Sequence, residues 1–254
     1  MAKNDNRRKY IDAAYRILER DGLDGISIRK VADEVGCSSA ALYKHFDNLD
    51  ELVVYASIRF LSDYSLDVQT LSKVDLNPLQ LNIQLWECFA FYAFRNVPVF
   101  EQLFYNTDPD LLSSVLYDFY QIFPEELTNV RSYMITMMGN SDIKKRGFLT
   151  MSKAVDMGMI DMESLSYLCE TDSYIFRGML AEYRDKYKEG DNAKIATRKF
   201  MKIMVKNYNS QLRPGNQILV VSPLNDPNMR KKLKKTSEKD YLDALAVVER
   251  ASYH

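Results

Sequence analysis

Cysteine, histidine, glycine and proline are all scarce in this sequence. The 254 residues include three cysteines, two histidines, nine glycines and seven prolines. The cysteines, at positions 37, 88 and 169, are odd in number and none belongs to a C-x-x-C pair, so we expect no disulfide framework. His45 and His254 are too few to complete a Cys/His zinc site, and we expect no metal and no cofactor. Reduced thiols favour a cytoplasmic protein.

Long apolar runs and a net charge of either sign are also missing. No stretch approaches the roughly 18 consecutive apolar residues that indicate a membrane span, so we expect no membrane partner. Residues 1–9 are mostly polar or charged and lead into an amphipathic segment, so we expect no signal peptide. Because 34 basic residues offset 35 acidic ones, any binding of nucleic acid must come from a local patch.

Sequence motifs of enzymes are absent as well. There is no G-x-S-x-G, no phosphate-binding glycine loop and no H-E-x-x-H. Cys37 and His45 are eight residues apart across a helical turn, which is not a catalytic pairing. We therefore expect a protein that is not an enzyme and has no catalytic residues.

Apolar residues recur at helical spacing along most of the chain, and strict alternation is nearly absent. Short stripes within residues 11–18, 31–35 and 42–46 predict three small helices, and a longer helix begins at Leu49. Further helices are predicted over residues 78–96, 109–123, 125–138, 141–157, 161–187 and 191–212. The pattern therefore predicts an all-α fold.

The character of the sequence changes after Pro214 and Gly215. Residues 217–222 form a β-branched run that predicts a strand or an extended arm, and residues 230–235 are a basic cluster that we interpret as solvated. Ser237 fits an N-cap ahead of an apolar stripe at residues 241–248. Because these apolar segments are poorly suited to water, we expect this extension to be ordered against the body.

The strongest functional signal lies near the N-terminus. The second and third predicted helices are very short and are joined by a four-residue junction, Gly36–Ser39. Gly36 suits the left-handed position that ends a helix, and Ser38 can cap the next helix by accepting a backbone N–H. No acidic residue occurs from Gly36 to Phe46, while Leu42 and Phe46, four apart, face the core. This pattern is typical of a helix-turn-helix, whose second helix enters the major groove of DNA.

Four segments together resemble the tetracycline-repressor (TetR) family of bacterial transcription regulators: Gly22–Gly25, Ser27–Ser38, Leu42–Phe46 and Asp50–Leu52. Their order and spacing match the family's DNA-binding domain without a gap over about residues 7–60. The resemblance implies contacts to the DNA backbone and to the groove. The backbone contacts are Ser27, which also caps the second helix, Tyr43 and His45, and the groove-facing residues are Ser38, Ser39, Ala40 and Lys44.

One position departs from the family pattern, because Leu49 stands where a lysine is usual. Binding would then lean more on the basic N-terminal arm, in which we single out Arg7. Each of three residues has an alternative interpretation when it is taken alone. Tyr43 can be a half-buried core aromatic, His45 a structural residue, and Arg7 part of a solvated helix start.

The central region is rich in aromatic residues, which either fill a helical core or line a deep pocket. The candidates for an effector pocket are Trp86, Phe89, Tyr92, Phe104, Tyr105, Tyr117, Tyr120 and Phe176. The resemblance implies that the last two helices of the body meet their symmetry mates in a four-helix dimer interface; the alternative is packing within one chain. The interface candidates are Leu165, Leu168, Phe176, Met179, Tyr183, Phe200, Ile203 and Met204.

We divide the chain into a three-helix DNA-binding domain (residues 1–48), a connecting helix (49–66), a helical effector-binding and dimerisation domain (67–212) and a C-terminal extension (213–254). The resemblance implies a homodimeric regulator, expected to repress, that binds a palindromic operator in double-stranded DNA. A small apolar or amphipathic effector would release it. One alternative is a DNA-binding protein whose body responds to a protein partner. The other is an enzyme with an incidental helix-turn-helix segment.

Overall fold

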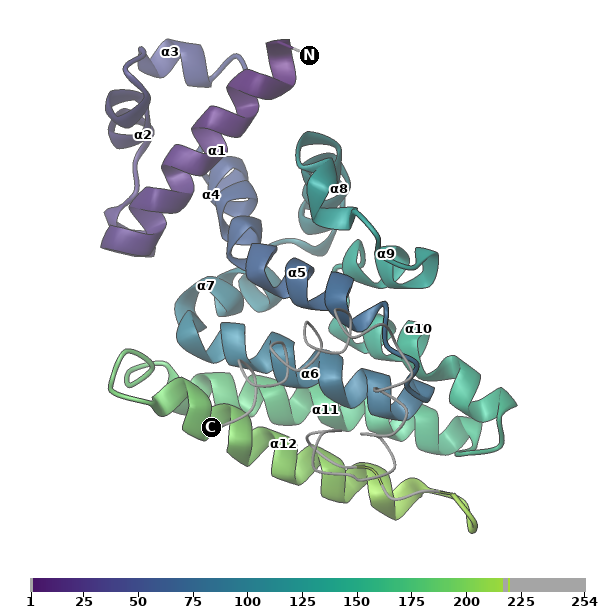
Figure 1. The fold of residues 1–254 in the computed structure, drawn as a ribbon. Helices are drawn as coiled ribbons and strands as arrows, with labels where there is room; N and C mark the ends of the chain where they lie inside the picture. Colours follow the sequence, from purple (N-terminus) through teal and green to yellow (C-terminus); the bar gives the residue numbers. More distant parts are fainter. Residues whose placement is uncertain (1, 217–218, 220–254) are drawn as a thin grey trace.

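The computed structural model describes residues 2–216 and residue 219, and side chains from residue 6 onward. Within this part of the chain every regular element is a helix, as the sequence predicts (Figure 1). The first elements are α1 (Ala2–Asp21), α2 (Ile28–Val35), α3 (Ser39–Leu42), α4 (Leu49–Ile58), the 3₁₀ turn η2 (Arg59–Leu61) and α5 (Ser62–Leu71). The body continues with α6 (Pro78–Arg95), α7 (Val97–Glu101), η3 (Gln102–Asn106), α8 (Pro109–Ile122), η4 (Pro124–Leu127), α9 (Ser132–Met138), α10 (Ile143–Asp156), α11 (Met162–Tyr183) and α12 (Asn192–Gln211).

Short polar side chains determine where several of these helices begin. The side chains of Asn77, Asp108, Asp142 and Asp161 accept backbone N–H groups at the starts of α6, α8, α10 and α11. Such caps satisfy donors that have no partner within the helix.

Two of the predicted helices are wrong in their extent. The helix predicted over residues 125–138 is divided, because η4 ends at Leu127 and α9 begins only at Ser132. Between them Asn129 has a φ of 60°, a left-handed conformation that asparagine tolerates and a helix does not. The connecting helix predicted over residues 49–66 is likewise interrupted by η2, and α5 then continues to Leu71.

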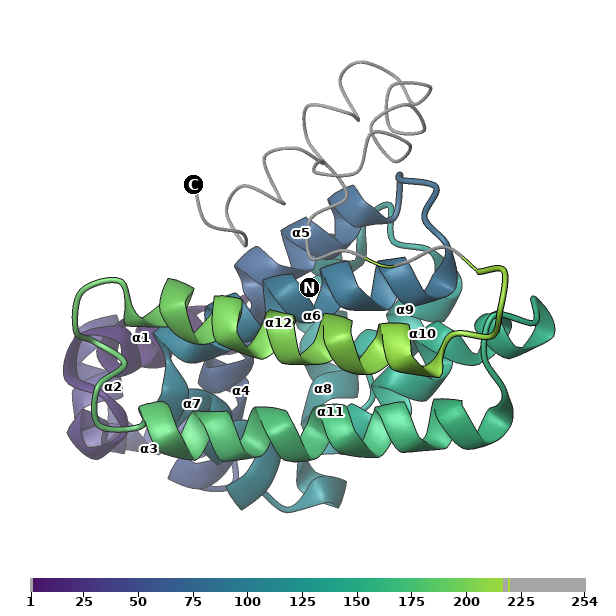
Figure 2. The same ribbon diagram turned by 90° about the horizontal axis from the view of Figure 1, so that it is seen from below.

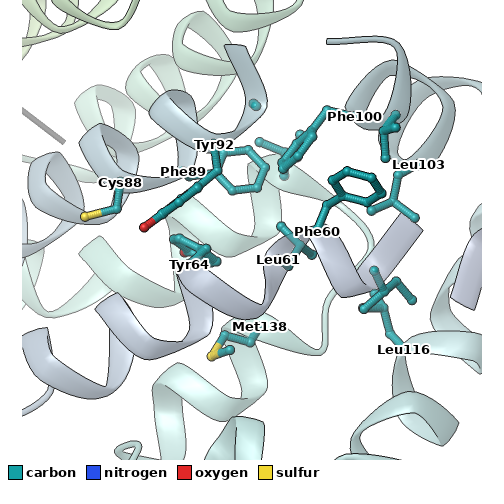
Figure 3. Close-up of a cluster of buried hydrophobic side chains, with 14 of the residues drawn as sticks. Phe60, Leu61, Tyr64, Cys88, Phe89, Tyr92, Phe100, Leu103, Leu116 and Met138 are labelled. Carbon is teal, nitrogen blue, oxygen red and sulfur yellow. The ribbon is translucent and has the colours of Figure 1, made fainter. Parts of the chain in front are cut away.

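A continuous apolar core joins the connecting segment to the body. Figure 3 shows Leu61 and Tyr64 of that segment on the side of Phe89 and Tyr92 of α6, with Phe60 beside Phe100 and Leu103. The rings of Tyr64 and Phe89 lie 5.4 Å apart, nearly perpendicular to each other. Phe100 and Leu103 extend this cluster, and both are buried. Because the packing is continuous, a change in the body can act on α4 and α5.

The helices α11 and α12 lie side by side on the face opposite the N-terminal helices, as the two views in Figures 1 and 2 show. α12 also packs extensively on α6, so one side of the α11–α12 pair closes the core. Beyond α12, the backbone N–H of Leu219 donates to Asn209 Oδ1 at 2.6 Å, and its side chain is buried. The rest of the predicted arm, the basic cluster and the stripe at residues 241–248 lie outside the described residues.

Candidate functional site

The helices α2 and α3 form a compact helix-turn-helix unit. α2 begins at Ser27, whose Oγ accepts the backbone N–H of Lys30 at 3.2 Å, as predicted. It ends at Gly36, which has a φ of 75° and whose N–H points back to the last turn of the helix. This left-handed conformation strains a residue with a Cβ atom, so glycine suits the turn.

The inner face of the unit is held by Val31 of α2 together with Leu42 and Phe46, and all three are buried. The Phe46 ring lies 6.3 Å from Tyr10 of α1 and 5.6 Å from Tyr55 of α4. The assignment of Leu42 and Phe46 to the core is therefore confirmed. This packing fixes the orientation of α3 relative to both neighbouring helices.

The outer face of the unit carries the residues that the sequence assigns to DNA. Tyr43 is 57% exposed, so it is not a core aromatic. Lys44, Ser38 and Ala40 are also exposed, whereas Ser39 and Ser27 are half-buried. The expected cap at Ser38 is not formed, since its side chain makes no capping hydrogen bond. Its exposed hydroxyl can therefore bond to a ligand instead.

His45 and Arg7 both pack against neighbouring side chains. The half-buried His45 ring packs 5.4 Å from the Tyr10 ring, in line with the structural alternative. Arg7, which we expected at the DNA, turns into the molecule: its guanidinium donates to Asp118 Oδ2 at 3.1 Å and to Tyr55 Oη at 2.5 Å. With 13% of its side chain exposed, Arg7 joins α1 to the body.

Arg29 is a candidate that the sequence reasoning missed. It lies on α2 with 89% of its side chain exposed, and its contact with Asp33 is a loose 3.8 Å pair. Because the first helix of such a unit crosses the DNA backbone, an exposed guanidinium there suits a phosphate contact. The sequence signal for Arg29 is that it is a charged residue of the short second helix and does not belong to the apolar stripe of that helix.

Comparison with known proteins matches residues 11–56 to the family described as bacterial regulatory proteins, tetR family. The same region is 42% identical over 57 residues to the HTH-type nicotine-responsive transcriptional repressor HdnoR of Paenarthrobacter nicotinovorans, covering 22% of this chain and 29% of HdnoR. It is 38% identical over 64 residues to the class D tetracycline repressor protein of Escherichia coli, covering 24% of this chain and 29% of that repressor. The chain therefore spans under a third of these relatives.

The fold of the rest of the chain is also shared with solved structures. A protein from a study of the control of antibiotic production by bacterial hormones has a TM-score of 0.53 at 16% identity, covering 82% of this chain and 98% of its own. RolR in complex with resorcinol has a TM-score of 0.50 at 12% identity, covering 85% of this chain and 98% of its own. The N-terminal region therefore matches the DNA-binding domain of the TetR family. The names of the two sequence relatives describe repressors and not enzymes, as the analysis of the sequence predicts.

The helical body holds a small cavity of about 30 Å³. Trp86 and Phe89, two of the effector candidates, line it, and Phe176 packs behind them with ring centroids 5.3 and 5.4 Å away. Phe104 and Tyr105 instead line a separate pocket of about 230 Å³ beside α8 and α10. The effector candidates that line a pocket are thus divided between two separate pockets.

The other effector candidates have different environments. The Tyr92 hydroxyl donates to Asp67 Oδ2 at 3.0 Å within the core, and Tyr120 is buried against Phe119. Tyr117 is 70% exposed, so its assignment to an internal pocket is wrong. The reason is the amphipathic character of α8, whose opposite face holds the buried residues.

Most of the residues predicted for a dimer interface pack within the single chain. Seven of the eight are at most 6% exposed in the single chain, so they pack within it: Leu165, Leu168, Phe176, Met179, Tyr183, Phe200 and Met204. Only Ile203, at 40% exposure, lies on the outer face. The exposed face also carries Tyr167 and Tyr174 of α11, which together with Ile203 of α12 line a groove of about 690 Å³. Apolar residues occur on both the inner and the outer faces of α11 and α12. The residues that the sequence analysis assigns to a dimer interface belong to the inner face.

No helix among the described residues has the length and apolar character that crossing a membrane requires. No group of three or more histidine, cysteine or acidic side chains is placed there to hold a metal ion.

Proposed function

We propose that this protein is a dimeric DNA-binding transcriptional regulator, acting as a repressor that a small effector releases from a two-fold operator. The observation that carries the proposal is the exposed polar face of the helix-turn-helix, with Tyr43 and Lys44 directed outward and Phe46 inward. Hydroxyl and cationic groups on one convex face match the phosphates and base edges of the major groove.

The DNA contacts divide into two groups. Tyr43, Arg29 and Ser27 face the phosphate backbone, while Ser38, Ser39, Ala40 and Lys44 face the base edges. Arg7 is left out, because its pair with Asp118 already occupies it. Since few long donors reach the bases, specificity rests on serine hydroxyls, Lys44 and apolar contact with thymine methyl groups.

A second copy of the chain covers the outer face of α11 and α12. This face combines the exposed aromatic rings of Tyr167 and Tyr174 with Ile203. It also carries both signs of charge, with Glu170 exposed on α11 and Lys202 lining the groove beside α12. A two-fold axis brings this face of one subunit against the same face of the other. Apolar side chains can then meet apolar side chains, and acidic side chains can meet basic ones. The dimer is needed because a single short recognition helix makes too few contacts for specific affinity.

Ionic contacts between the two domains support the release mechanism. Arg59 Nη1 donates to Glu126 Oε1 of η4 at 2.7 Å, while Arg59 Nε donates to Asp12 Oδ1 of α1 at 3.1 Å. Arg7 and Asp118 make a second bridge between α1 and α8. A shift of η4 or α8 therefore acts on α1, and tilting α1 changes the separation of the two recognition helices in a dimer.

A direct test uses labelled DNA from upstream of the gene that encodes this protein. We expect a shift of that DNA by the purified dimer, with affinity falling steeply as salt increases because phosphate contacts dominate. Failure to bind this DNA or any genomic fragment would reject the proposal and revive the enzyme alternative.

The effector is tested by reciprocity. Any compound that lowers operator affinity must bind more weakly, by the same factor, when operator is present. Equal affinity with and without operator would exclude this mechanism and favour regulation by a protein partner.

A further inference from the structure

Arg146 of α10 is a buried cation without an anionic partner. Its side chain is 7% exposed, and no ion pair involves it among the described residues. The guanidinium donates through Nε to the Asn140 carbonyl at 2.6 Å and through Nη2 to the Met138 carbonyl at 3.0 Å. The nearest acidic influence is Asp142, whose carboxylate is occupied with the N–H groups at the start of α10. Burial lowers the pKa of the guanidinium.

These two hydrogen bonds leave most of the donor capacity of Arg146 unused. A guanidinium has five N–H donors, and no described acceptor takes a hydrogen bond from Nη1. The group lies 4.9 Å from the centroid of the Phe104 ring and 6.0 Å from that of Phe89, which partly stabilises the charge. Aromatic faces do not replace a counter-ion, because taking a charge out of water is unfavourable and an anionic partner offsets more of that cost.

The small cavity of the body lies directly against Arg146. Its other walls combine hydrogen-bonding groups, on Asn82 and Thr150, with apolar surface from Leu85, Trp86 and Phe89. We propose that this cavity binds the carboxylate end of a small amphipathic acid, with Arg146 as the counter-ion and the aromatic walls around the hydrocarbon part. A carboxylate is favoured over other groups because its two oxygens match the planar fork of a guanidinium. The inference deepens the proposed function, because it specifies the chemical class of the effector.

Binding has to widen the cavity, since about 30 Å³ holds no more than one or two water molecules. Met137 of α9 and Ile143 of α10 form part of the wall, and methionine adapts easily to a new shape. α9 is seven residues long and follows η4, which carries Glu126. An acid that displaces α9 therefore acts close to the Glu126–Arg59–Asp12 contacts between the domains.

The sequence supplies a reporter for this site. Trp86 is the only tryptophan in the protein and lines the cavity, so fluorescence excited selectively at tryptophan reports on the surroundings of that one side chain. The probes are saturated carboxylates from hexanoate to dodecanoate, below their micelle-forming concentrations, and the matching primary amides. The assay contains no DNA, so its result is independent of whether the protein binds an operator.

We expect saturable changes in Trp86 fluorescence with at least one carboxylate, at about tenfold or greater affinity than its amide, because only the carboxylate forms charge-assisted bonds with Arg146. Arg146→Met should remove this preference and Arg146→Lys should retain part of it. Lys145→Met is the matched control, because Lys145 is the adjacent exposed cation on α10, and it should bind like the wild type.

Three results would overturn the proposal. They are equal affinity for acid and amide in the wild-type protein, an unchanged preference in Arg146→Met, and no saturable response to any chain length. Circular dichroism melts check that each variant is folded. If Arg146→Met does not fold, the acid-to-amide comparison in the wild type and the Arg146→Lys variant decide. Acid binding without any effect on DNA would instead reject the release mechanism and leave the site standing.

Discussion

Tyr43 and Phe46 are three residues apart yet have opposite roles. Tyr43 is 57% exposed on the outer face, whereas Phe46 is 2% exposed and packs between α1 and α4. We predict that Tyr43→Phe leaves the free energy of unfolding unchanged and weakens DNA binding roughly fivefold, since one hydrogen bond is worth about 1 kcal/mol. Phe46→Ala should instead destabilise the fold by about 3–5 kcal/mol. Urea unfolding and fluorescence anisotropy with labelled DNA measure both effects, and equal destabilisation by the two variants would contradict the assignment of faces.

Asp172 makes the stability of the protein depend on pH. Burial raises the pKa of its carboxyl group to about 8, while the hydrogen bond that Tyr208 donates acts in the opposite direction. The folded state thus binds the proton more tightly than the unfolded chain, whose aspartates titrate near pH 4. The contribution of Asp172 to the free energy of unfolding should therefore be greatest below about pH 4. It should be lost as pH rises from there through about 8.

Glu87 is also buried with its pKa raised, so it adds a similar pH dependence to the stability. Comparing the variant Asp172→Asn with the wild type isolates the contribution of Asp172. We expect the loss of stability between about pH 5 and pH 9 to be smaller in Asp172→Asn than in the wild type. Asp185→Asn, at an exposed position, is the control and should follow the wild type. Parallel pH profiles of wild type and Asp172→Asn in urea unfolding would show that Asp172 is charged in the folded protein.

Local spacing was enough to predict some residues but not others. Leu42 and Phe46 were placed correctly because residues four apart share a helix face, and Gly36 because a left-handed turn favours glycine. Arg7 was misplaced because its partner, Asp118, is 111 residues away in the sequence. Arg146 was missed because a single arginine in an amphipathic helix gives no sign that it is buried.

At the scale of elements, two capping positions near the recognition unit differ in what they contribute. Asn48 Oδ1 accepts the Glu51 N–H at 2.8 Å, and Glu51 Oε2 accepts the Asp47 N–H at 2.6 Å, so α4 begins with a reciprocal cap. Ser38 occupies the corresponding position before α3 without such a bond. The start of α4 is therefore stabilised by its cap, whereas the Ser38 hydroxyl at the start of α3 is left available to a ligand.

We predict that Asn48→Ala lowers the free energy of unfolding by about 1 kcal/mol, because the Glu51 N–H at the start of α4 loses its acceptor. Ser38→Ala, the matched variant, should change stability by much less and should weaken DNA binding. Urea unfolding and DNA titration of both variants provide the comparison. Similar losses of stability, with no loss of DNA affinity in Ser38→Ala, would contradict the proposed role of Ser38.

The sequence predicted most elements because their caps and apolar periodicity are local. It did not predict the 3₁₀ turn η2 inside the connecting segment, where Arg59 contacts both Asp12 and Glu126. No glycine or proline marks that position, and a tightened turn in such a place is typical of a hinge. The division between η4 and α9 depends on Asn129, whose left-handed conformation has only a weak sequence signal.

At the scale of the whole molecule, substitutions on the outer face of α11 and α12 test the proposed dimer contact. We predict that the double variant Tyr174→Asp/Ile203→Asp is a folded monomer, because two charges would be buried in the dimer contact. Tyr117→Asp, which changes an equally exposed tyrosine on α8, should remain dimeric. Sedimentation equilibrium measures both. A dimeric double variant would place the dimer interface elsewhere.

Composition and periodicity were sufficient to predict an all-helical molecule with a small N-terminal unit. They could not show which stripe of α11 and α12 faces inward, since that depends on how α6 packs against them. Nor could they show how the two domains contact each other. Those contacts join α1 to α8 and η4, segments whose proximity only the tertiary fold creates.

The most direct test of a dimeric operator-binding protein is selection from a library of random double-stranded DNA. The account predicts enrichment of two-fold symmetric sequences whose half-sites are about one helical turn, roughly 34–36 Å, or a multiple of it apart. It also predicts that Tyr43→Phe weakens binding to the selected sequence and that Tyr174→Asp/Ile203→Asp abolishes the selection of symmetric sites. No enrichment, or enrichment of a single asymmetric half-site by the wild-type protein, would contradict the central claim.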